Sequence, residues 1–266
     1  MKLSIITVNL NDSKGLQKTI ETVTSQSFTD YEYIVVDGGS TDGSVEVIKE
    51  HEGHINHWIS EKDKGIYEAM NKGIRLAKGD YLLMLNSGDY LVDDTVLDKA
   101  FKAVENEDVD IFYGDIFMNR EGTLTPDSFP DELTFGFFME RCLSHQATFI
   151  RRKLHETVGL YSEHLKIAAD WEFFILAICK FNAGYRHIPV TLTVYNAVGI
   201  SSDPKNYDLL VDEQDKIKRK YFPAFWPDYQ ISYEQKMRLK YFMDTKFYKM
   251  YKIAVAIKKK IVPKKP

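Results

Sequence analysis

The stretch that most constrains the fold is an apolar run at residues 81–85, which ends in the polar turn Asn86-Ser87-Gly88-Asp89. A continuous apolar run of this length is typical of a strand buried on both faces of an α/β sheet. Ligands of such sheets bind outside the carboxyl ends of the strands. The sequence therefore predicts that Asp89 lies at a ligand-binding edge.

The first 90 residues alternate between strand-like and helix-like segments. Apolar runs of strand length lie at residues 3–8, 31–36, 55–59 and 81–85. Helical spacing of apolar residues follows the first run at Leu16, Ile20 and Val23, with Asp12 or Ser13 as the cap, and residues 66–77 also fit a helix. This alternation predicts βαβ units, and hence an α/β fold with a mostly parallel central sheet flanked by helices.

The rest of the chain is less regular. We expect helices at residues 95–104, 151–158, 169–179 and 207–220, and strands at 111–113, 147–150 and 185–195. Residues 196–206, rich in Gly, Ser and Asp, predict a loop.

Charge and cysteine content limit the class of protein. From Lys236 onward the chain has eleven Lys and Arg residues and one acidic residue, so the first 235 residues carry a net charge of −14 within a total of −4. An acidic body argues against a nucleic-acid binder. Cys142 and Cys179 lie in apolar surroundings and fit free thiols in a reducing cytoplasm. The apolar N-terminus is too short for a secretory signal.

Polar residues gather where the predicted parallel strands end. Thr7 and Asn9 end the first strand, Asp37 ends the second, and Asp89 follows the fourth. Each can be an ordinary cap of a strand–helix turn. Together they predict one crevice, in which a carboxylate can accept from a base or ribose, or hold a divalent cation against a diphosphate.

Two common nucleotide-binding classes do not match. Gly38-Gly39-Ser40 is not the glycine pattern of a dinucleotide fold, and the first turn, residues 9–13, has no glycine. The chain also has no P-loop. These absences argue against a dehydrogenase and against a P-loop nucleotidase.

Four segments together resemble a known family. They are Ser4-Ile5-Ile6-Thr7-Val8-Asn9, then the run from Tyr33 through Asp37-Gly38-Gly39-Ser40-Thr41-Asp42-Gly43, then Glu61 through Asp63-Lys64-Gly65 to Gly73, then Leu85-Asn86-Ser87-Gly88-Asp89. Their order and spacing resemble the family 2 glycosyltransferases of bacterial polysaccharide synthesis, which have the GT-A fold. The resemblance is close over residues 1–90, looser to about residue 205, and absent from the tail.

The resemblance implies a donor site. The residues expected to bind the nucleotide are Thr7, Asn9, Asp37, Gly38, Asp63, Lys64, Asn71, Asn86 and Ser87. Asp89 matches the last acid of the family's D-x-D region and would bind Mg²⁺ or Mn²⁺. Asn86 and Gly88 stand where acids are usual, which leaves Asp89 as the expected direct ligand.

The resemblance also implies an acceptor side. Asp170 matches the catalytic base of the family, with Ala169 where Glu is common, and Glu172 is the competing candidate. A plain helix cap is the alternative role of Asp170. His145, Trp171, Glu172 and Ser201 would contact the acceptor or the diphosphate; His145 can equally be a hydrogen-bonded core residue, and Ser201 can belong to a plain surface loop. Selection of the sugar is expected within residues 112–141.

These inferences predict an inverting glycosyltransferase, which moves a sugar from a nucleoside-diphosphate donor, a UDP-sugar, to an acceptor hydroxyl in surface polysaccharide biosynthesis. A nucleotidyltransferase and a non-catalytic nucleotide-sugar-binding scaffold remain alternatives. We expect a GT-A domain at residues 1–205, in which residues 1–90 bind the nucleotide and residues 91–205 the acceptor, and a basic helical extension at 206–266. The expected location is cytoplasmic, with a lipid-linked saccharide as a candidate acceptor and tail contact to the inner membrane face.

Overall fold

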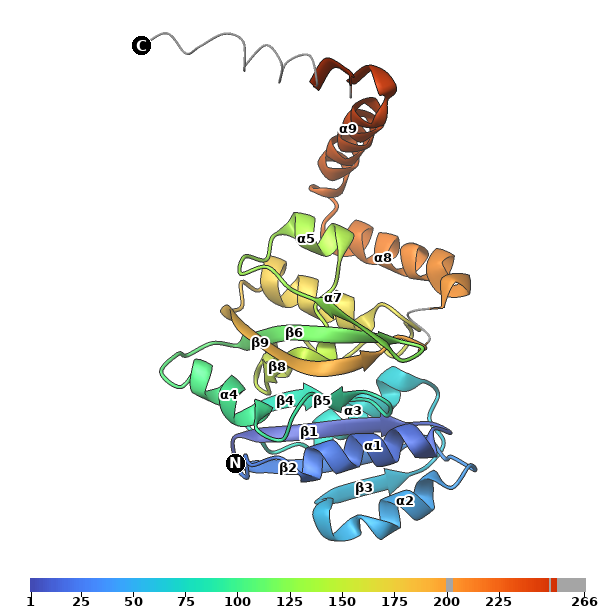
Figure 1. Ribbon diagram of the computed structural model, residues 1–266, viewed down its shortest axis with the longest axis vertical. Helices are drawn as coiled ribbons and strands as arrows, with labels where there is room; N and C mark the ends of the chain where they lie inside the picture. Colours follow the sequence, from blue (N-terminus) through green and yellow to red (C-terminus); the bar gives the residue numbers. More distant parts are fainter. Residues whose placement is uncertain (200–202, 249, 253–266) are drawn as a thin grey trace. The chain divides into compact units, whose positions relative to one another are not determined.

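The computed structural model describes residues 1–199, 203–248 and 250–252. One nine-stranded sheet forms the framework of the described chain, in the order β3-β2-β1-β4-β8-β6-β9-β5, with β7 paired to β6 (Figure 1). Its strands are β1 (Leu3–Asn9), β2 (Tyr31–Asp37), β3 (His57–Ser60), β4 (Tyr81–Met84), β5 (Tyr90–Leu91), β6 (Ile111–Arg120), β7 (Thr123–Asp127), β8 (Thr148–Arg151) and β9 (Tyr185–Asn196).

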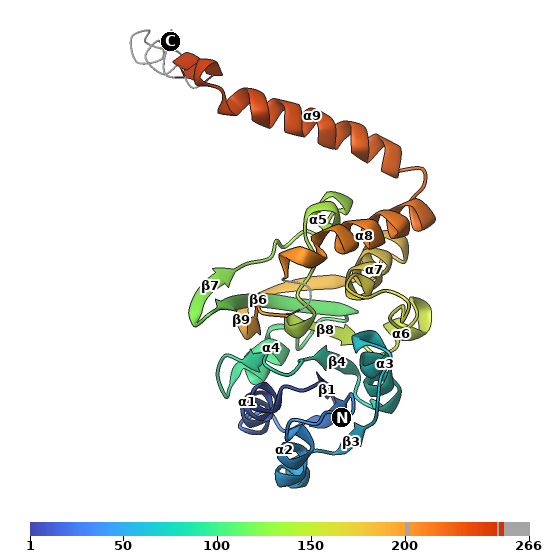
Figure 2. The same ribbon diagram turned by 90° about the vertical axis from the view of Figure 1, so that its right-hand side faces the viewer.

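The first seven α-helices lie between strands along the chain, and two more follow the last strand in the described residues. The α-helices are α1 (Ser13–Thr24), α2 (Ser44–Glu50), α3 (Ile66–Leu76), α4 (Val96–Ala103), α5 (Phe135–Glu140), α6 (Leu154–Thr157), α7 (Ala169–Ile175), α8 (Tyr207–Tyr221) and α9 (Trp226–Asp244). Figure 2 shows α1 and α2 on one face of the first four strands and α3 on the other. Shorter helical turns lie at Glu52–His54, His145–Ala147 and Pro204–Asn206.

The first half of the sheet is parallel, as the sequence predicted. β1 pairs in parallel with β2 and β4, and β2 pairs in parallel with β3. In this register Asn9 lies opposite Asp37, and Asp37 lies opposite Ser60. Beyond β4 the sheet is mixed, because β8 runs antiparallel to both of its neighbours while β6 and β9 are parallel to each other.

Close packing behind β1 depends on glycine. A Cβ on Gly79 would lie 2.6 Å from the backbone of Leu3 and of Ser4, closer than van der Waals contact permits. Gly79 lies between the end of α3 and the start of β4, which is fully buried. The chain therefore packs closely where β1 and β4 begin, at the edge of the sheet opposite the strand ends that carry polar residues.

Two elements differ from the sequence-based expectation. β6 spans residues 111–120 rather than 111–113, because its second half, residues 116–120, pairs with the exposed strand β7, where Pro126 is tolerated at the edge of the sheet. The helix expected over residues 169–179 is α-helical only to Ile175 and continues as a π-helix at Leu176–Lys180.

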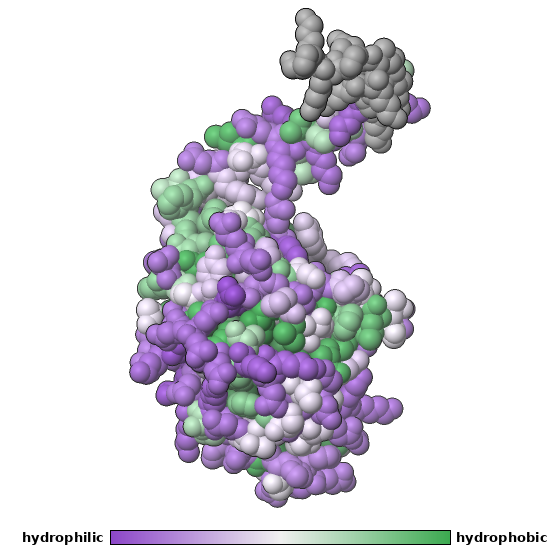
Figure 3. Space-filling view, turned by 60° about the vertical axis from the view of Figure 1, so that its left-hand side comes forward, coloured by the Kyte–Doolittle hydropathy of each residue, from purple (hydrophilic) through white to green (hydrophobic). Residues whose placement is uncertain are grey.

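The chain divides into two compact units, Met1–Gln214 and a second unit that begins at Asp215. The domain boundary predicted after residue 205 lies nine residues before the division at Gln214, and it stays a prediction. The main helix of the second unit, α9, exposes large apolar side chains, including Ile231, Leu239 and Tyr241. Figure 3 shows hydrophobic residues in patches among hydrophilic ones on one face of the molecule. Within the described ranges, no helix is long and apolar enough to cross a membrane.

Candidate active site

The ends of β1 and β2 form a polar cluster around Asp37. Its carboxylate accepts hydrogen bonds from Asn9 Nδ2 (2.8 Å), Ser60 Oγ (2.7 Å), Ser40 N (2.9 Å), Ser40 Oγ (2.5 Å) and Gly39 N (3.1 Å). Burial raises the pKa of Asp37, but these hydrogen bonds outweigh it and hold the pKa below its ordinary value. Asp37 is thus an ionised carboxylate held by its neighbours, and its contact with a ribose or a base stays a prediction.

Asp63 joins this cluster from the loop after β3. A Cβ placed on Gly38 would lie 3.4 Å from Asp63 Oδ2, which shows that this carboxylate lies beside the turn after β2. Lys72 forms ion pairs with Asp63 and with Glu61. Burial raises the pKa of Asp63 and outweighs the lysine. Asp63 Oδ2 and Asn9 Oδ1 are buried acceptors without a hydrogen-bond partner in the described chain, which suits the N–H or O–H donors of a ligand.

Three of the residues expected to bind the nucleotide have other contacts. Thr7 is fully buried, and its hydroxyl donates to the Leu85 carbonyl (2.7 Å). Asn71 donates to the Tyr161 carbonyl (2.8 Å) and accepts from the Tyr161 amide (3.0 Å), so it positions that segment. Lys64 is exposed, and its amide donates to Glu68 Oε2. A nucleotide contact by these residues stays a prediction.

The turn after β4 forms a second cluster. Asp89 is 4% exposed, and its Oδ1 accepts from the Asn196 amide (2.8 Å). Gly88 has a φ of 90°, and a Cβ there would lie 3.1 Å from Asn196 Nδ2 and 3.3 Å from Asp12 Oδ2. Burial raises the pKa of Asp89 to about 7, although Asn196 and His145 act in the opposite direction. Asp12 also raises the pKa of Asp89, which shows that the two carboxylates lie close enough to repel each other.

We tested whether these residues suit a divalent cation. The described residues contain no group of three or more His, Cys, Asp or Glu side chains that could hold a metal ion by themselves. Mg²⁺ sites in nucleotide-dependent enzymes commonly use one or two carboxylates together with substrate phosphates. Asp89 and Asp12 fit that smaller set, with the diphosphate completing the coordination.

The third cluster surrounds Asp170 at the start of α7. Its Oδ2 lies 3.1 Å from His145 Nδ1, and its Oδ1 accepts from the Trp171 amide (2.9 Å) and lies 3.1 Å from the Tyr67 hydroxyl. His145 Nε2 lies 3.1 Å from Asn86 Nδ2. Burial lowers the pKa of His145, but the neighbouring Asp170 outweighs it and raises the pKa. A continuous contact Asp170–His145–Asn86 thus joins the acceptor side to the turn that carries Asp89.

The other acceptor-side candidates are placed differently. Trp171 is buried, and its indole donates to the Phe138 carbonyl (2.6 Å), so its ring packs behind Asp170. Glu172 is buried and accepts from the Ser162 hydroxyl. These positions do not favour contact with an acceptor, which for both residues stays a prediction. Ser201 lies outside the described residues.

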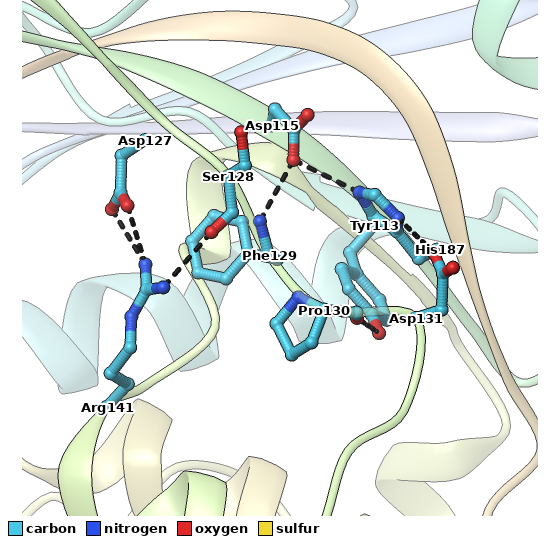
Figure 4. Close-up of polar contacts among 9 residues, drawn as sticks. All are labelled: Tyr113, Asp115, Asp127, Ser128, Phe129, Pro130, Asp131, Arg141 and His187. Atoms are coloured by element: carbon cyan, nitrogen blue, oxygen red, sulfur yellow. Dashed lines mark hydrogen bonds and ion pairs between the residues drawn. The ribbon is translucent and has the colours of Figure 1, made fainter. Parts of the chain in front are cut away.

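Polar contacts anchor the segment in which selection of the sugar was expected. Figure 4 shows His187 between Asp115 (3.0 Å) and Asp131 (2.7 Å), and Arg141 in a two-pronged contact with Asp127 (2.7 and 2.9 Å). The Tyr113 hydroxyl donates to the Pro130 carbonyl (2.6 Å). These contacts fix residues 127–131 and Arg141 on either side of α5, which precedes His145.

Several site residues were not singled out from the sequence. Ser40 and Ser60 hold Asp37, Asn196 holds Asp89, and Tyr67 contacts Asp170. Ser40 follows Gly38-Gly39 in the turn after β2, so its contact with Asp37 could have been inferred from the sequence. Asn196 and Tyr67 come from elements far away in the chain, so only the fold reveals their role.

The fold and these clusters define the class: a mixed α/β sheet with polar residues at the ends of β1 and β2, as in glycosyltransferases with the GT-A fold. The chain belongs to the family Glycosyl transferase family 2, which matches residues 4–156. It is 33% identical over 201 residues, or 74% of this chain and 77% of the relative, to a PGL/p-HBAD biosynthesis glycosyltransferase of Mycobacterium bovis. It is also 30% identical over 186 residues to chondroitin synthase of Escherichia coli, covering 65% of this chain and 26% of that enzyme.

Solved structures support the same fold. TarS 1–349 of S. aureus in complex with UDP-GlcNAc superimposes with a TM-score of 0.63 at 20% identity, over 74% of this chain and 58% of that one. The mannosyltransferase PcManGT from Pyrobaculum calidifontis, in complex with GDP-Man and Mn²⁺, gives 0.58 at 15% identity, over 76% and 58%. The chain thus spans less than two thirds of these proteins. The expected GT-A fold and glycosyltransferase class are confirmed.

Proposed function

We propose that this glycosyltransferase transfers a sugar from a UDP-sugar to an acceptor hydroxyl with inversion at the anomeric carbon. The observation that carries the proposal is the contact chain Asp170–His145–Asn86, because it places a partly exposed carboxylate next to the turn that carries Asp89. A base and a donor-binding edge in one site are what a single displacement requires.

In this proposal Asp170 is the base. The acceptor oxygen forms a bond to C1 while the bond from C1 to the diphosphate oxygen breaks, and the electron pair leaves with the diphosphate. The acceptor proton passes to a carboxylate oxygen of Asp170. A carboxylate has about four acceptor positions. Three contacts are present at Asp170, from His145, Tyr67 and Trp171, which leaves room for the acceptor hydroxyl.

The donor nucleotide would lie along the ends of β1, β2 and β4. The unpartnered Asp63 Oδ2 and Asn9 Oδ1 would accept from the donors of the nucleoside, and Asp37, whose carboxylate already accepts five hydrogen bonds, would hold Asn9 and Ser40 in place. Uracil has a single ring N–H, which a single acceptor satisfies. The UDP-GlcNAc complex of TarS, a protein of the same fold, is consistent with this choice.

A divalent cation fits the edge beside Gly88. Asp89 and Asp12 would hold Mg²⁺ or Mn²⁺, which when bound neutralises the charge that develops on the departing diphosphate. PcManGT has Mn²⁺ with its nucleotide sugar, which supports the choice of cation class.

The acceptor is proposed to be a saccharide of surface polysaccharide or glycolipid synthesis. A relative named as a PGL/p-HBAD biosynthesis glycosyltransferase is consistent with a role in biosynthesis, and a lipid-linked saccharide is proposed as the acceptor. We further propose that α9 contacts an anionic membrane surface through its exposed apolar side chains and the basic residues from Lys236 onward. Co-sedimentation of the full chain with anionic vesicles, and not with neutral ones, is expected; equal recovery in both pellets contradicts membrane contact.

The decisive experiment is incubation with a panel of UDP- and GDP-sugars, with and without Mn²⁺. We expect slow, cation-dependent release of UDP from one UDP-sugar, and weaker UDP binding by Asp37→Asn. A nucleotidyltransferase would instead release pyrophosphate from a nucleoside triphosphate and a sugar phosphate. Donor binding without turnover under every condition would favour the scaffold and contradict the proposal.

A further inference from the structure

Glu213, near the middle of α8, makes an unusual set of contacts with the segment that leads into α7. Its Oε1 accepts from the Lys166 amide (2.8 Å), and its Oε2 accepts from the amides of Ile167 and Ala168 (both 3.0 Å). Glu213 is 5% exposed, so this carboxylate is buried against three consecutive backbone donors. All of these residues belong to the first compact unit, which ends at Gln214.

The backbone amides of residues 166–168 need a hydrogen-bond acceptor from outside this segment. Ala168 stands at the N-cap of α7, and alanine cannot accept hydrogen bonds through its side chain. Buried amide groups without a partner destabilise the fold, because they lose their hydrogen bonds to water. One side chain from α8 satisfies all three, and its two oxygens set the orientation of the peptide groups immediately before Asp170.

The orientation of these peptides controls a proton next to Asp170. The Tyr67 hydroxyl lies 2.6 Å from the Ile167 carbonyl and 3.1 Å from Asp170 Oδ1. A phenol has one proton to donate. The shorter contact assigns that proton to the Ile167 carbonyl, whose peptide group also contains the Ala168 amide that Glu213 binds, so Oδ1 of Asp170 does not receive it.

We propose that Glu213 is a positioning residue for the transfer reaction: it holds residues 166–168 so that Ile167 takes the Tyr67 proton and Asp170 is left free to accept the proton of the acceptor hydroxyl. This proposal rests on Asp170 as the base in the proposed function. The consequence is that α8, which was expected to belong to a separate basic extension, supports the catalytic helix.

The test uses Glu213→Gln in the full chain. The amide has nearly the same shape but turns an N–H₂ group toward backbone donors, so the peptide at Ile167 shifts and the Tyr67 hydroxyl turns to Asp170. We expect kcat to fall about 10- to 100-fold with the donor KM unchanged, as for a small misplacement of a reacting group. The acid limb of the kcat–pH profile should move to lower pH, because a hydrogen bond to a carboxylate favours its charged form.

A double mutant separates the effect of Tyr67 from the effects of the other groups that face Asp170. They are His145, Tyr67, Tyr161 and Cys142. In Tyr67→Phe/Glu213→Gln the acid limb should coincide with that of Tyr67→Phe alone, since only Tyr67 transmits the effect. Asp208→Asn is the matched control, because it removes the same charge from an exposed position of the same helix.

Several outcomes overturn the proposal. A wild-type kcat and pH profile in Glu213→Gln would do so, and so would a loss of rate without a shift of the acid limb, which indicates a purely structural role. If Glu213→Gln does not fold, Tyr67→Phe decides alone: an unchanged acid limb supports the proposal, and a limb at higher pH shows that Tyr67 already donates to Asp170. If the proposed function itself is wrong, Asp170→Asn remains active, and this result distinguishes that failure from a failure of the role proposed for Glu213.

Discussion

His145 Nδ1 lies 3.1 Å from Asp170 Oδ2, and the opposite nitrogen of the same ring faces Asn86. In neutral His145, Nδ1–H donates to Asp170 while Nε2 accepts from the Asn86 amide. A charged ring would have N–H groups on both sides and would need Asn86 to present its Oδ1, which is buried and has no partner in the described chain. The pair therefore couples the protonation of His145 to the orientation of Asn86.

The first prediction concerns the pH dependence of stability. Because Asp170 raises the pKa of His145 in the folded chain, folding gains free energy from this pair at pH values below 6.5, and the gain is lost as pH rises through the folded pKa. In urea unfolding, the excess stability of the wild type over His145→Gln should shrink as pH rises from about 5.5 to 8.5, because the titrations of His155 and Asp89 are common to both chains. The exposed His164→Gln is the control and should keep the decline. Parallel curves for wild type and His145→Gln would contradict the coupling.

The second prediction concerns the base. Asp170→Asn keeps the size of the side chain but cannot take up a proton, so transfer should fall about 10²- to 10⁴-fold. Binding of UDP, measured by calorimetry, should change little, because Asp170 lies on α7 and not on the strand ends. Glu172→Gln, the competing candidate, should retain transfer. Retained transfer in Asp170→Asn would remove Asp170 from this role.

The third prediction concerns the cation. Chelation by EDTA should stop UDP release, and Mn²⁺ should restore it. Asp89→Asn keeps an acceptor for the Asn196 amide but removes the charge, so activity should require much more Mn²⁺. The exposed Asp80→Asn is a matched control just before β4. Full activity of Asp89→Asn at the wild-type Mn²⁺ concentration would mean that the cation binds at another strand end.

The fourth prediction concerns acid stability away from the site. His155 is buried against Phe173 (ring centroids 4.5 Å apart), and burial lowers its pKa to about 4. The unfolded chain takes up the proton first as pH falls below 6.5, so the folded state loses stability between pH 6.5 and 4. A pKa of about 4 against 6.5 corresponds to about 3 kcal/mol over that range.

His155→Phe keeps the ring packing and removes the titration. Its free energy of unfolding should fall less steeply from about pH 6.5 to 5 than that of the wild type, as followed by urea unfolding. The exposed His54→Gln should behave as the wild type does. Equal slopes in wild type and His155→Phe would show that His155 takes up its proton without cost.

Sequence alone was sufficient where local pattern and strand direction decide the structure. The apolar runs predicted β1, β2 and β4, and parallel pairing then brought Asn9 opposite Asp37 at one edge. The motif order identified the family, and Asp12, one of the two expected caps, does cap α1. These features depend on residues within a few positions of one another, or on the simple rule that parallel strands end together.

Tertiary structure alone decided the contacts between distant segments. It paired His145 with Asp170 and with the turn after β4, buried the ring of Trp171 behind α7, and brought Glu213 onto the amides before Asp170. The turn after β4, residues 86–89, holds Asp89 and also Asn86, which contacts His145. Long-range hydrogen bonds of buried polar groups depend on how elements pack, and no periodicity along the chain records which partner each group finds.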